Sequence, residues 1–216
     1  MTGYVPLNER PYGGHARLLE LALAARPSDV LDVGCSSGYL AQPMSAAGAR
    51  VVGIELDAAA ADAARAWCTE VLIGDVEAME LPFAAASFDV ILCGDLVEHL
   101  RDPGTALARL RPLLRARGRL VLTTPNVANW AMRLSLLAGR WRYTDRGILD
   151  RTHTHLFTRS TLVETVESAG YRVVVLDHTA PVPGIGTPSV ERIAHAVARL
   201  RPSLFAYQFL VAATPK

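Results

Sequence analysis

Lysine is nearly absent from this chain of 216 residues: Lys216 is the only one, so arginine carries almost all of the positive charge. The 22 basic and 21 acidic side chains leave a formal net charge of +1, which gives no global attraction to nucleic acid or to an anionic membrane. Cysteine is scarce as well, and Cys35, Cys68 and Cys93 form no C-x-x-C pair. A disulfide framework or a zinc knuckle is therefore not expected, whereas a reducing cytoplasm fits.

Long apolar runs are missing too. The longest candidate, 127–139, is short and is interrupted by Arg133. No signal-peptide pattern opens the chain, so we expect a cytoplasmic protein without a transmembrane segment. Half of the residues are hydrophobic and only 20% are charged. A chain of this length and composition can bury one sizeable core, which predicts a single domain over 1–216.

What the sequence does contain is an alternation of short apolar segments with segments of helical spacing. It predicts strands over 29–33, 50–54, 71–73, 88–93 and 119–124, and helices over 15–25, 39–47, 58–68 and 104–114. Such alternation is typical of βαβ units, hence of an α/β fold with a parallel sheet. After an insertion over 126–157, we expect helices over 160–169 and 189–200 and strands over 172–176 and 204–213.

Glycine-rich or acidic loops follow the first three strands. The first loop lies in VLDVGCSSGYL, residues 30–40, where glycines let a ligand approach the backbone and the next helix offers free N–H groups. Glu55 ends the second strand, at the spacing of an acid that binds ribose hydroxyls, and Asp75 follows the third. Asp57 is more simply the N-cap of the next helix. Because ligands of open parallel sheets bind at the carboxyl ends of the strands, these loops predict a cofactor site.

The same loops do not favour a dinucleotide. Residues 34–39 read Gly-Cys-Ser-Ser-Gly-Tyr and contain no G-x-G-x-x-G pattern, so no pyrophosphate cradle is evident. Asp32 would repel phosphates but suits a cationic or an amino-acid-bearing ligand.

These motifs together resemble those of class I S-adenosylmethionine-dependent methyltransferases, over roughly residues 13–180. VLDVGCSSG is similar to the family's motif I, VVGIE to its second strand and GDVE to its adenine-side acid. LPFAAASFDVILCGDLVEHLRDP and RGRLVLTTPN resemble the fourth- and fifth-strand segments. The resemblance implies a Rossmann-like, seven-stranded, mostly parallel sheet in a three-layer sandwich, with the last strand antiparallel and an insertion after the fifth. Ser36 stands where glycine is more common, and GCSSG resembles a subgroup of the family.

The resemblance also implies S-adenosyl-L-methionine as the cofactor and S-adenosyl-L-homocysteine as the product. Asp32, Gly34 and Gly38 would surround the methionine part, Glu55 would bind the ribose, and Asp75 with the backbone of Val76 would bind adenine. The implied cofactor-binding residues are Asp32, Gly34, Cys35, Ser36, Gly38, Glu55, Leu56, Asp75, Val76 and Gly94.

Methyl transfer from a sulfonium is an in-line displacement that often needs a base for the acceptor. Asp95 and His99 in CGDLVEHL are candidates, although Asp95 and Glu98 also fit a D-x-x-E capping pattern. His153 lies in LDRTHTHLFT, which resembles an Asp-Arg-Thr-His signature of methyltransferases that are linked to cell-surface sugars. His155 stands where arginine is more common in that signature. The alternative is that Thr158 caps the next helix and the histidines are polar loop residues.

The three other histidines, His15, His178 and His195, are expected on the surface or in packing. A metal site made of Glu98, His99, His153 and His155 is an alternative, but their spacing does not require one, and we expect no metal.

The insertion over 126–157 is expected to line or cover the acceptor site. The candidate acceptor-binding residues are Asn126, Trp130, Tyr143, Arg151 and His155. Trp130 and Tyr143 could stack on a sugar or an aromatic ring, or simply pack the insertion against the core. Because the insertion is rich in arginine, an anionic acceptor such as a nucleotide sugar or an acidic membrane-bound glycan is a further alternative.

We therefore expect an enzyme that methylates a hydroxyl group of a small molecule, such as a sugar or a specialised metabolite. We expect no nucleic-acid partner, and a homodimer is possible. The alternative from another class is a non-catalytic module that binds S-adenosylmethionine or supports a partner enzyme.

Overall fold

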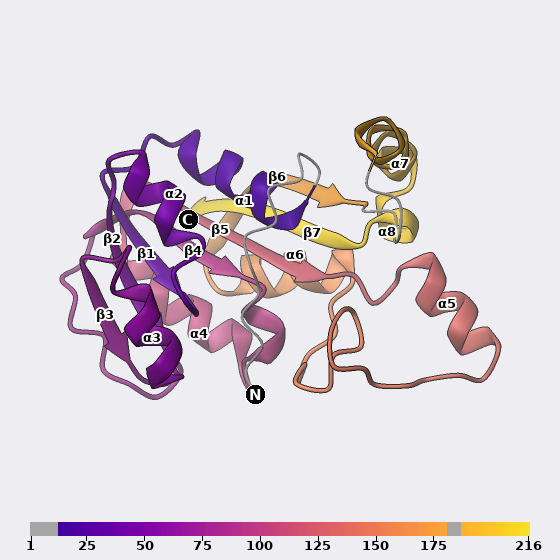
Figure 1. Ribbon diagram of the computed structural model, residues 1–216, viewed down its shortest axis with the longest axis horizontal. Coiled ribbons are helices and arrows are strands. Elements are labelled where there is room, and N and C mark those ends of the chain that lie inside the picture. The colour runs from indigo at the N-terminus through magenta and orange to yellow at the C-terminus, as the bar shows by residue number, and fades with distance from the viewer. Residues whose placement is uncertain (1–12, 181–186) are drawn as a thin grey trace.

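A computed structural model describes residues 13–180 and 187–216. Seven strands form one sheet in the order β3-β2-β1-β4-β5-β7-β6, as Figure 1 shows. The strands are β1 (Asp29–Val33), β2 (Arg50–Glu55), β3 (Glu70–Ile73), β4 (Phe88–Gly94), β5 (Leu114–Pro125), β6 (Tyr171–Thr179) and β7 (Gln208–Pro215).

Strand direction follows the predicted scheme. β1 pairs in parallel with β2 and β4, β2 with β3, and β4 with β5. β7 lies between β5 and β6 and is antiparallel to both. The expectation of a mostly parallel seven-stranded sheet whose last strand is antiparallel is confirmed.

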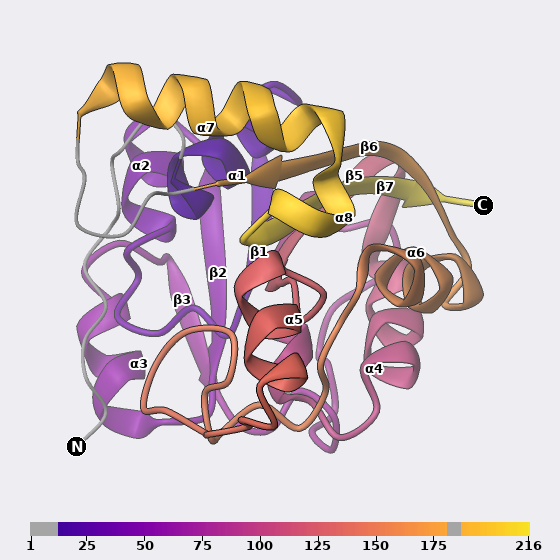
Figure 2. The same ribbon diagram turned by 90° about the vertical axis from the view of Figure 1, so that its right-hand side faces the viewer.

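Helices cover both faces of the sheet and make the three layers (Figures 1 and 2). Buried residues of α1, α2 and α3 pack on one face, and buried residues of α4 and α6 pack on the other. These helices are α1 (Gly14–Leu23), α2 (Ala41–Ala46), α3 (Ala58–Ala64), α4 (Pro103–Leu110) and α6 (Arg159–Ser168). Asp57 caps α3 as expected, by accepting a hydrogen bond of 2.9 Å from the N–H of Ala60. In Figure 2, α7 (Pro188–Leu200) lies on the α1 side of the sheet.

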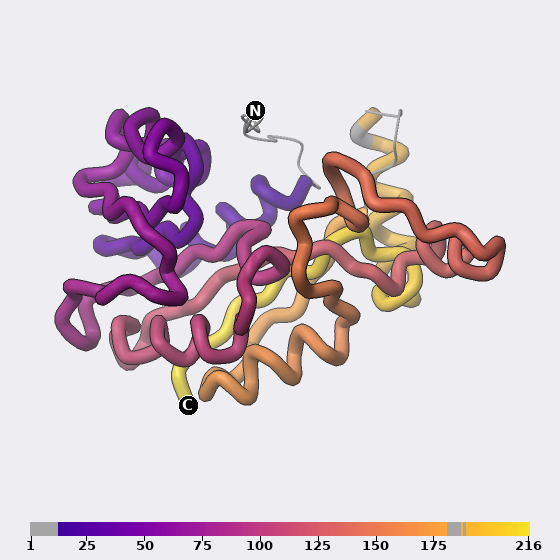
Figure 3. The backbone as a smooth tube through the Cα atoms, turned by 90° about the horizontal axis from the view of Figure 1, so that it is seen from below, coloured from indigo at the N-terminus to yellow at the C-terminus, as the bar shows by residue number. Residues whose placement is uncertain are grey.

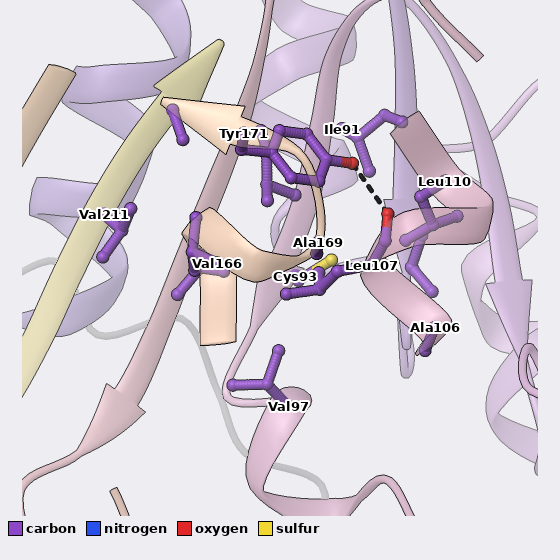
Figure 4. Close-up of a cluster of buried hydrophobic side chains, with 14 of the residues drawn as sticks. Ile91, Cys93, Val97, Ala106, Leu107, Leu110, Val166, Ala169, Tyr171 and Val211 are labelled. Carbon is purple, nitrogen blue, oxygen red and sulfur yellow. Dashed lines mark hydrogen bonds between the residues drawn. The ribbon is translucent and has the colours of Figure 1, made fainter. Parts of the chain in front are cut away.

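One core cluster joins α4 and α6 to the sheet, and Figure 4 shows its centre. Tyr171, the first residue of β6, is fully buried there. Its hydroxyl donates a hydrogen bond of 2.9 Å to the carbonyl oxygen of Leu107 on α4. A buried tyrosine hydroxyl needs such a partner, so this bond fixes α4 against β6, an edge strand of the sheet.

Several element boundaries differ from the prediction, three of them for the following reasons. The helix expected over 104–114 ends at Leu110, and a 3-10 turn, η2 (Arg111–Leu113), follows because Pro112 cannot donate a helical hydrogen bond. β5 starts at Leu114, because Leu114 already pairs with Phe88 of β4; after a register shift the pairing resumes at Arg119 and Val90. The last strand starts at Gln208, because Pro202 opens a short helix, α8 (Pro202–Phe205).

The insertion contributes one helix, α5 (Trp130–Leu137), which projects away from the sheet in Figures 1 and 3. No residue of α5 is buried. The chain then returns toward the sheet as a loop that ends at Thr158, the N-cap of α6. In the part of the chain that the structure describes, no helix is long and apolar enough to cross a membrane.

Candidate active site

The carboxyl ends of β1, β2, β3 and β4 surround a cavity of about 780 Å³. These four strands are parallel neighbours, so their following loops meet at one edge of the sheet. Eight of the predicted site residues line the cavity, namely Gly34, Ser36, Glu55, Leu56, Asp75, Val76, Asp95 and His99. Cys35, Gly38 and Gly94 belong to the same loops and strand ends but do not line the cavity.

The loop after β1 is held in a left-handed conformation at three positions. The φ angles are +71° at Gly34, +48° at Ser36 and +80° at Gly38. At Gly38 space is also limiting, because a Cβ atom would lie 3.1 Å from the Cα of Ala64 on α3. Ser36 accepts a conformation that costs an L-residue about 1–2 kcal/mol, and its N–H is fixed by a hydrogen bond of 2.8 Å to Glu55 Oε2.

Glu55 ends β2 and turns its carboxylate into the loops. Oε1 accepts hydrogen bonds of 2.9 Å from the N–H groups of Leu56 and Asp57, and Oε2 accepts the one from Ser36. Three backbone donors therefore fix the carboxylate, and about one of its four lone-pair positions remains for a ligand hydroxyl. Glu55 is thus pre-oriented at the position that the sequence assigns to a ribose.

Asp75 follows β3 and is ion-paired. Its Oδ1 accepts a hydrogen bond from the N–H of Glu77, and its Oδ2 pairs with the guanidinium of Arg101. Arg101 also lines the cavity and is largely exposed. The sequence around Arg101 gives no sign of this role, because its partner Asp75 lies 26 residues earlier in the chain.

Asp32 is the unusual acid of the site. It is 1% exposed, and neither carboxylate oxygen has a hydrogen-bond partner among the residues that the structure describes. Burial, and then the charge of Glu55, raise its pKa to about 7. An unpartnered buried carboxyl group behind the cofactor loop fits a ligand that brings its own positive charge.

Two histidines meet at the cavity, where His99 lines the wall. The rings of His99 and His153 are 4.8 Å apart at an interplanar angle of 71°. His153 Nδ1 lies 3.1 Å from the carbonyl oxygen of Ile148, and His99 Nδ1 lies 3.3 Å from that of Thr152. A carbonyl partner assigns the proton to Nδ1 in each neutral ring, so Nε2 is left as the basic atom. Burial, with the neighbouring His99, lowers the pKa of His153, which keeps its imidazole neutral at pH 7.

Glu98 completes this cluster from η1 (Val97–His99). It is 1% exposed. Burial, and then the charge of Asp95, raise its pKa well above the ordinary value. One ligand atom from each of Glu98, His99 and His153 lies within 4.8 Å of the others, so these three side chains could hold a metal ion. His155 is not among them, since its Nδ1 lies 2.9 Å from the carbonyl oxygen of Leu100.

Asp95 does not cap a helix, which corrects the D-x-x-E interpretation. The N-cap of η1 is Leu96 and has no side-chain bond. Asp95 has a φ of +49°, its N–H donates to Thr123 Oγ1, and its carboxylate accepts from the Thr123 hydroxyl and from Gln208 Nε2. Two strands, β5 and β7, therefore hold this carboxylate at the cavity.

Two further residues, His15 and Tyr39, lie near Asp95. His15 lies close enough for the Asp95 charge to raise its pKa, although burial outweighs this and the net shift is downward. Its ring lies 4.8 Å from that of Tyr39. This ring contact agrees with the expectation that His15 is a packing residue. His178 and His195 do lie elsewhere, where they stack at 4.6 Å.

The predicted acceptor-binding residues are spread over the insertion. Asn126 is fully buried and its amide bonds to the carbonyls of Ala206 and Ser203 and to the N–H of Ala128, so it packs the insertion. Arg151 is exposed and pairs with Asp145, and Tyr143 meets Trp141 edge-on. Trp130 lines a second cavity, and His155 lies beside Phe157. From the insertion, Thr152 alone lines the first cavity among the described residues.

Comparison with known proteins gives a consistent result. The model of a methyltransferase domain family matches residues 8–176. The chain is 31% identical over 167 residues to a ubiquinone biosynthesis O-methyltransferase of Mesorhizobium japonicum, over 72% of this chain and 65% of that protein. It is 32% identical over 145 residues to a probable S-adenosylmethionine-dependent methyltransferase of Mycolicibacterium smegmatis, over 67% of this chain and 52% of that protein. The matches thus span less than two thirds of these relatives.

Solved structures share the fold. A structure of a putative S-adenosylmethionine-dependent methyltransferase from Listeria monocytogenes superimposes with a TM-score of 0.66 at 16% identity, over 97% of this chain and 100% of that one. The [4+2]-cyclase SpnF superimposes with a TM-score of 0.62, also at 16% identity, over 92% and 80% of the two chains. At such identities the likeness shows the fold alone.

Proposed function

Because this chain belongs to the class I S-adenosylmethionine-dependent methyltransferases, we propose that it transfers the methyl group of S-adenosylmethionine to a hydroxyl group of a small molecule. One observation carries the proposal: the cavity at the ends of β1 to β4 joins the cofactor-binding motif residues to Asp95 and His99, with His153 behind His99. This arrangement supports a cofactor and an acceptor that bind at the same edge of the sheet.

The residues present fit the cofactor. When bound, S-adenosylmethionine supplies an electrophilic methyl group on a sulfonium and leaves as S-adenosylhomocysteine. Glu55 would accept a hydrogen bond from the ribose at its free lone pair, and Asp75 would face the adenine amine in competition with Arg101. The unpartnered Asp32 would hold the ammonium of the methionine part.

His153 is the base that we propose for the acceptor hydroxyl, with His99 as the second candidate. Its Nδ1 is held by the Ile148 carbonyl, so Nε2 would take the proton as the oxygen attacks. Asp95, fixed by Thr123 and Gln208, would orient the hydroxyl and stabilise the charge on the histidine. The low pKa of His153 supports this role because the neutral form predominates at pH 7.

A sugar or a specialised metabolite is the acceptor class that we propose. The LDRTHTHLFT segment is similar to that of sugar-linked methyltransferases, and the relatives named ubiquinone biosynthesis O-methyltransferase support oxygen as the methylated atom. We propose no nucleic-acid partner, in line with the net charge of +1. Three free cysteines support a reducing cytoplasm.

A homodimer is the assembly that we propose. Ile193, Val197 and Leu200 are 62%, 42% and 78% exposed and follow one another at helical spacing on α7. Such an apolar stripe is typical of a contact surface. Light scattering would measure the mass, and Leu200→Ser should reduce it to that of a monomer.

The test of the catalytic proposal is turnover with and without His153. S-adenosylhomocysteine production would be measured with a panel of phenols and sugars, for wild type, His153→Gln and the remote control His178→Gln. We expect His153→Gln to lower kcat at least about 100-fold at unchanged S-adenosylmethionine affinity. Equal loss of cofactor binding would assign His153 a structural role.

The second candidate is a non-catalytic module that binds S-adenosylmethionine, because fold does not determine function. The same assay separates the two. A module would bind S-adenosylmethionine yet release no S-adenosylhomocysteine with any acceptor of the panel.

A further inference from the structure

A second cavity, of about 750 Å³, lies between α5, the loop around 144–149 and the start of β7. It shares no lining residue with the cofactor cavity. Its walls come from two segments that are far apart in the sequence, the insertion and the α8–β7 connection, which Figure 1 shows side by side. The fold therefore builds this cavity, rather than one flexible loop.

The cavity carries unneutralised positive charge. Arg140, Arg142 and Arg146 line it, and none of the described residues that line it is acidic. None of the three guanidinium groups has an ion pair or a hydrogen bond with a described residue. Asp145, the acid nearest in sequence, pairs with Arg151. Guanidinium groups bind carboxylate and phosphate in a planar, bidentate manner, so the cavity is suited to an anionic group.

The remaining walls are largely apolar. Trp130, Phe205 and Tyr207 line the cavity together with Ile148 and Leu149. The Trp130 side chain is 49% exposed, and no contact of its ring with another ring is present among the described residues. An exposed tryptophan beside guanidinium groups fits an apolar or aromatic body that carries a negative charge.

The second cavity adjoins the reacting groups through two residues. Ile148 lines it, and its carbonyl oxygen lies 3.1 Å from His153 Nδ1. Tyr207 also lines it. Burial is the main cause that raises the pKa of the Tyr207 hydroxyl, and the charge of the nearby Asp95 is the second. A ligand in this cavity therefore reaches the wall behind His153 and Asp95.

We propose that the cavity lined by Arg140, Arg142 and Arg146 binds the carboxylate, phosphate or sulfate group of an amphiphilic acceptor whose apolar body lies on Trp130 and Phe205. This inference rests on the proposed function for the ligand's role as an acceptor. The binding of an anionic amphiphile can be measured without turnover.

The probe is 8-anilinonaphthalene-1-sulfonate, an aromatic anion, compared with neutral N-phenyl-1-naphthylamine, which lacks the sulfonate. We expect wild type to bind the sulfonate at least about tenfold more tightly than the neutral dye, with energy transfer from tryptophan. The double variant Arg140→Gln/Arg142→Gln should lose that preference and bind the neutral dye unchanged. Arg172→Gln, a single exposed arginine on β6, is the control and should change neither affinity.

Equal binding of the two dyes by wild type, or an unchanged preference in the double variant, would overturn the proposal. Circular dichroism of each variant verifies folding, and calorimetry with S-adenosylmethionine is run on the same samples. If the wild-type protein does not bind S-adenosylmethionine, the proposed function is refuted but the anionic site is not, because the dye preference tests the cavity independently.

Sedimentation with vesicles identifies the source of the anionic group. Co-sedimentation with phosphatidylglycerol vesicles but not with phosphatidylcholine vesicles, lost in the double variant, assigns a lipid headgroup. The dye preference without co-sedimentation assigns a soluble anion. Either result supports the anionic site.

Discussion

Replacing Asp32 by asparagine tests how the cofactor's positive charge is held. Asp32 has a pKa of about 7 because it is buried beside Glu55 without a partner. If the cofactor's ammonium binds the ionised form, affinity must rise with pH until Asp32 is fully ionised. About 3% of the group is ionised at pH 5.5 and about 75% at pH 7.5, so affinity should increase about 25-fold, or about 1.9 kcal/mol.

The assay is calorimetric titration with S-adenosylmethionine at half-unit steps between these two pH values. The range ends at pH 7.5 because a free α-amino group loses its own proton near pH 7.7–8.0. Asp32→Asn should bind weakly at every pH and show no slope. Glu98→Gln, which changes the other buried acid, should keep the slope. A flat profile for wild type, or the same slope in Asp32→Asn, would refute this role.

Asp32→Asn should weaken cofactor binding but stabilise the unliganded protein. The pKa of Asp32 is raised on folding, so its contribution to stability is present below pH 4 and is lost as the pH rises toward 7. At pH 7.5 Asp32→Asn should therefore stabilise the unliganded protein against urea, by at most about 4 kcal/mol. Destabilisation at this pH would contradict the burial argument.

Three further predictions concern other parts of the molecule. Ser36→Gly should raise the free energy of unfolding by up to about 1 kcal/mol. Glycine relieves the left-handed strain at a φ of +48° but loses more chain entropy on folding. If urea melts instead show a fall in the free energy of unfolding of more than about 1 kcal/mol, the serine hydroxyl is required. Tyr171→Phe should lower it by about 1 kcal/mol by removing the bond to Leu107, with unchanged cofactor affinity as the control. Methyl transfer should persist in EDTA if His153 acts as a base; loss in EDTA that added Mg²⁺ or Zn²⁺ restores would assign the cluster of Glu98, His99 and His153 to a metal.

The parts of the fold that could be predicted from sequence are those with a local pattern. Buried parallel strands are continuous apolar runs, and β1, β2 and β4 begin and end within a residue of the predicted positions. The acids at three strand ends, with Asp57 as an N-cap, likewise follow from short-range spacing. The boundaries at Pro112 and Pro202 could not be predicted, because the short helical turns there keep the apolar spacing of the longer element beside them.

The parts that could not be predicted depend on contacts between distant segments. Gln208 holds Asp95 from 113 positions along the chain, and His15 reaches the same site only because α1 packs on the sheet. The second cavity also needs Phe205 and Tyr207 to lie beside the insertion. No periodicity within one segment contains such information, and a composition rich in arginine gives only the sign of the charge.

Calorimetric titration of the wild-type protein with S-adenosylmethionine at pH 7.5 tests the central claim most directly. Glu55, Asp75 and the loop after β1 are preformed around one cavity, so we predict saturable binding at one site per chain with a Kd in the micromolar range, about 1–100 μM. Glu55→Ala should weaken it at least about tenfold by removing the acceptor for the ribose hydroxyls. Absence of binding up to about 1 mM by folded wild-type protein would contradict the account.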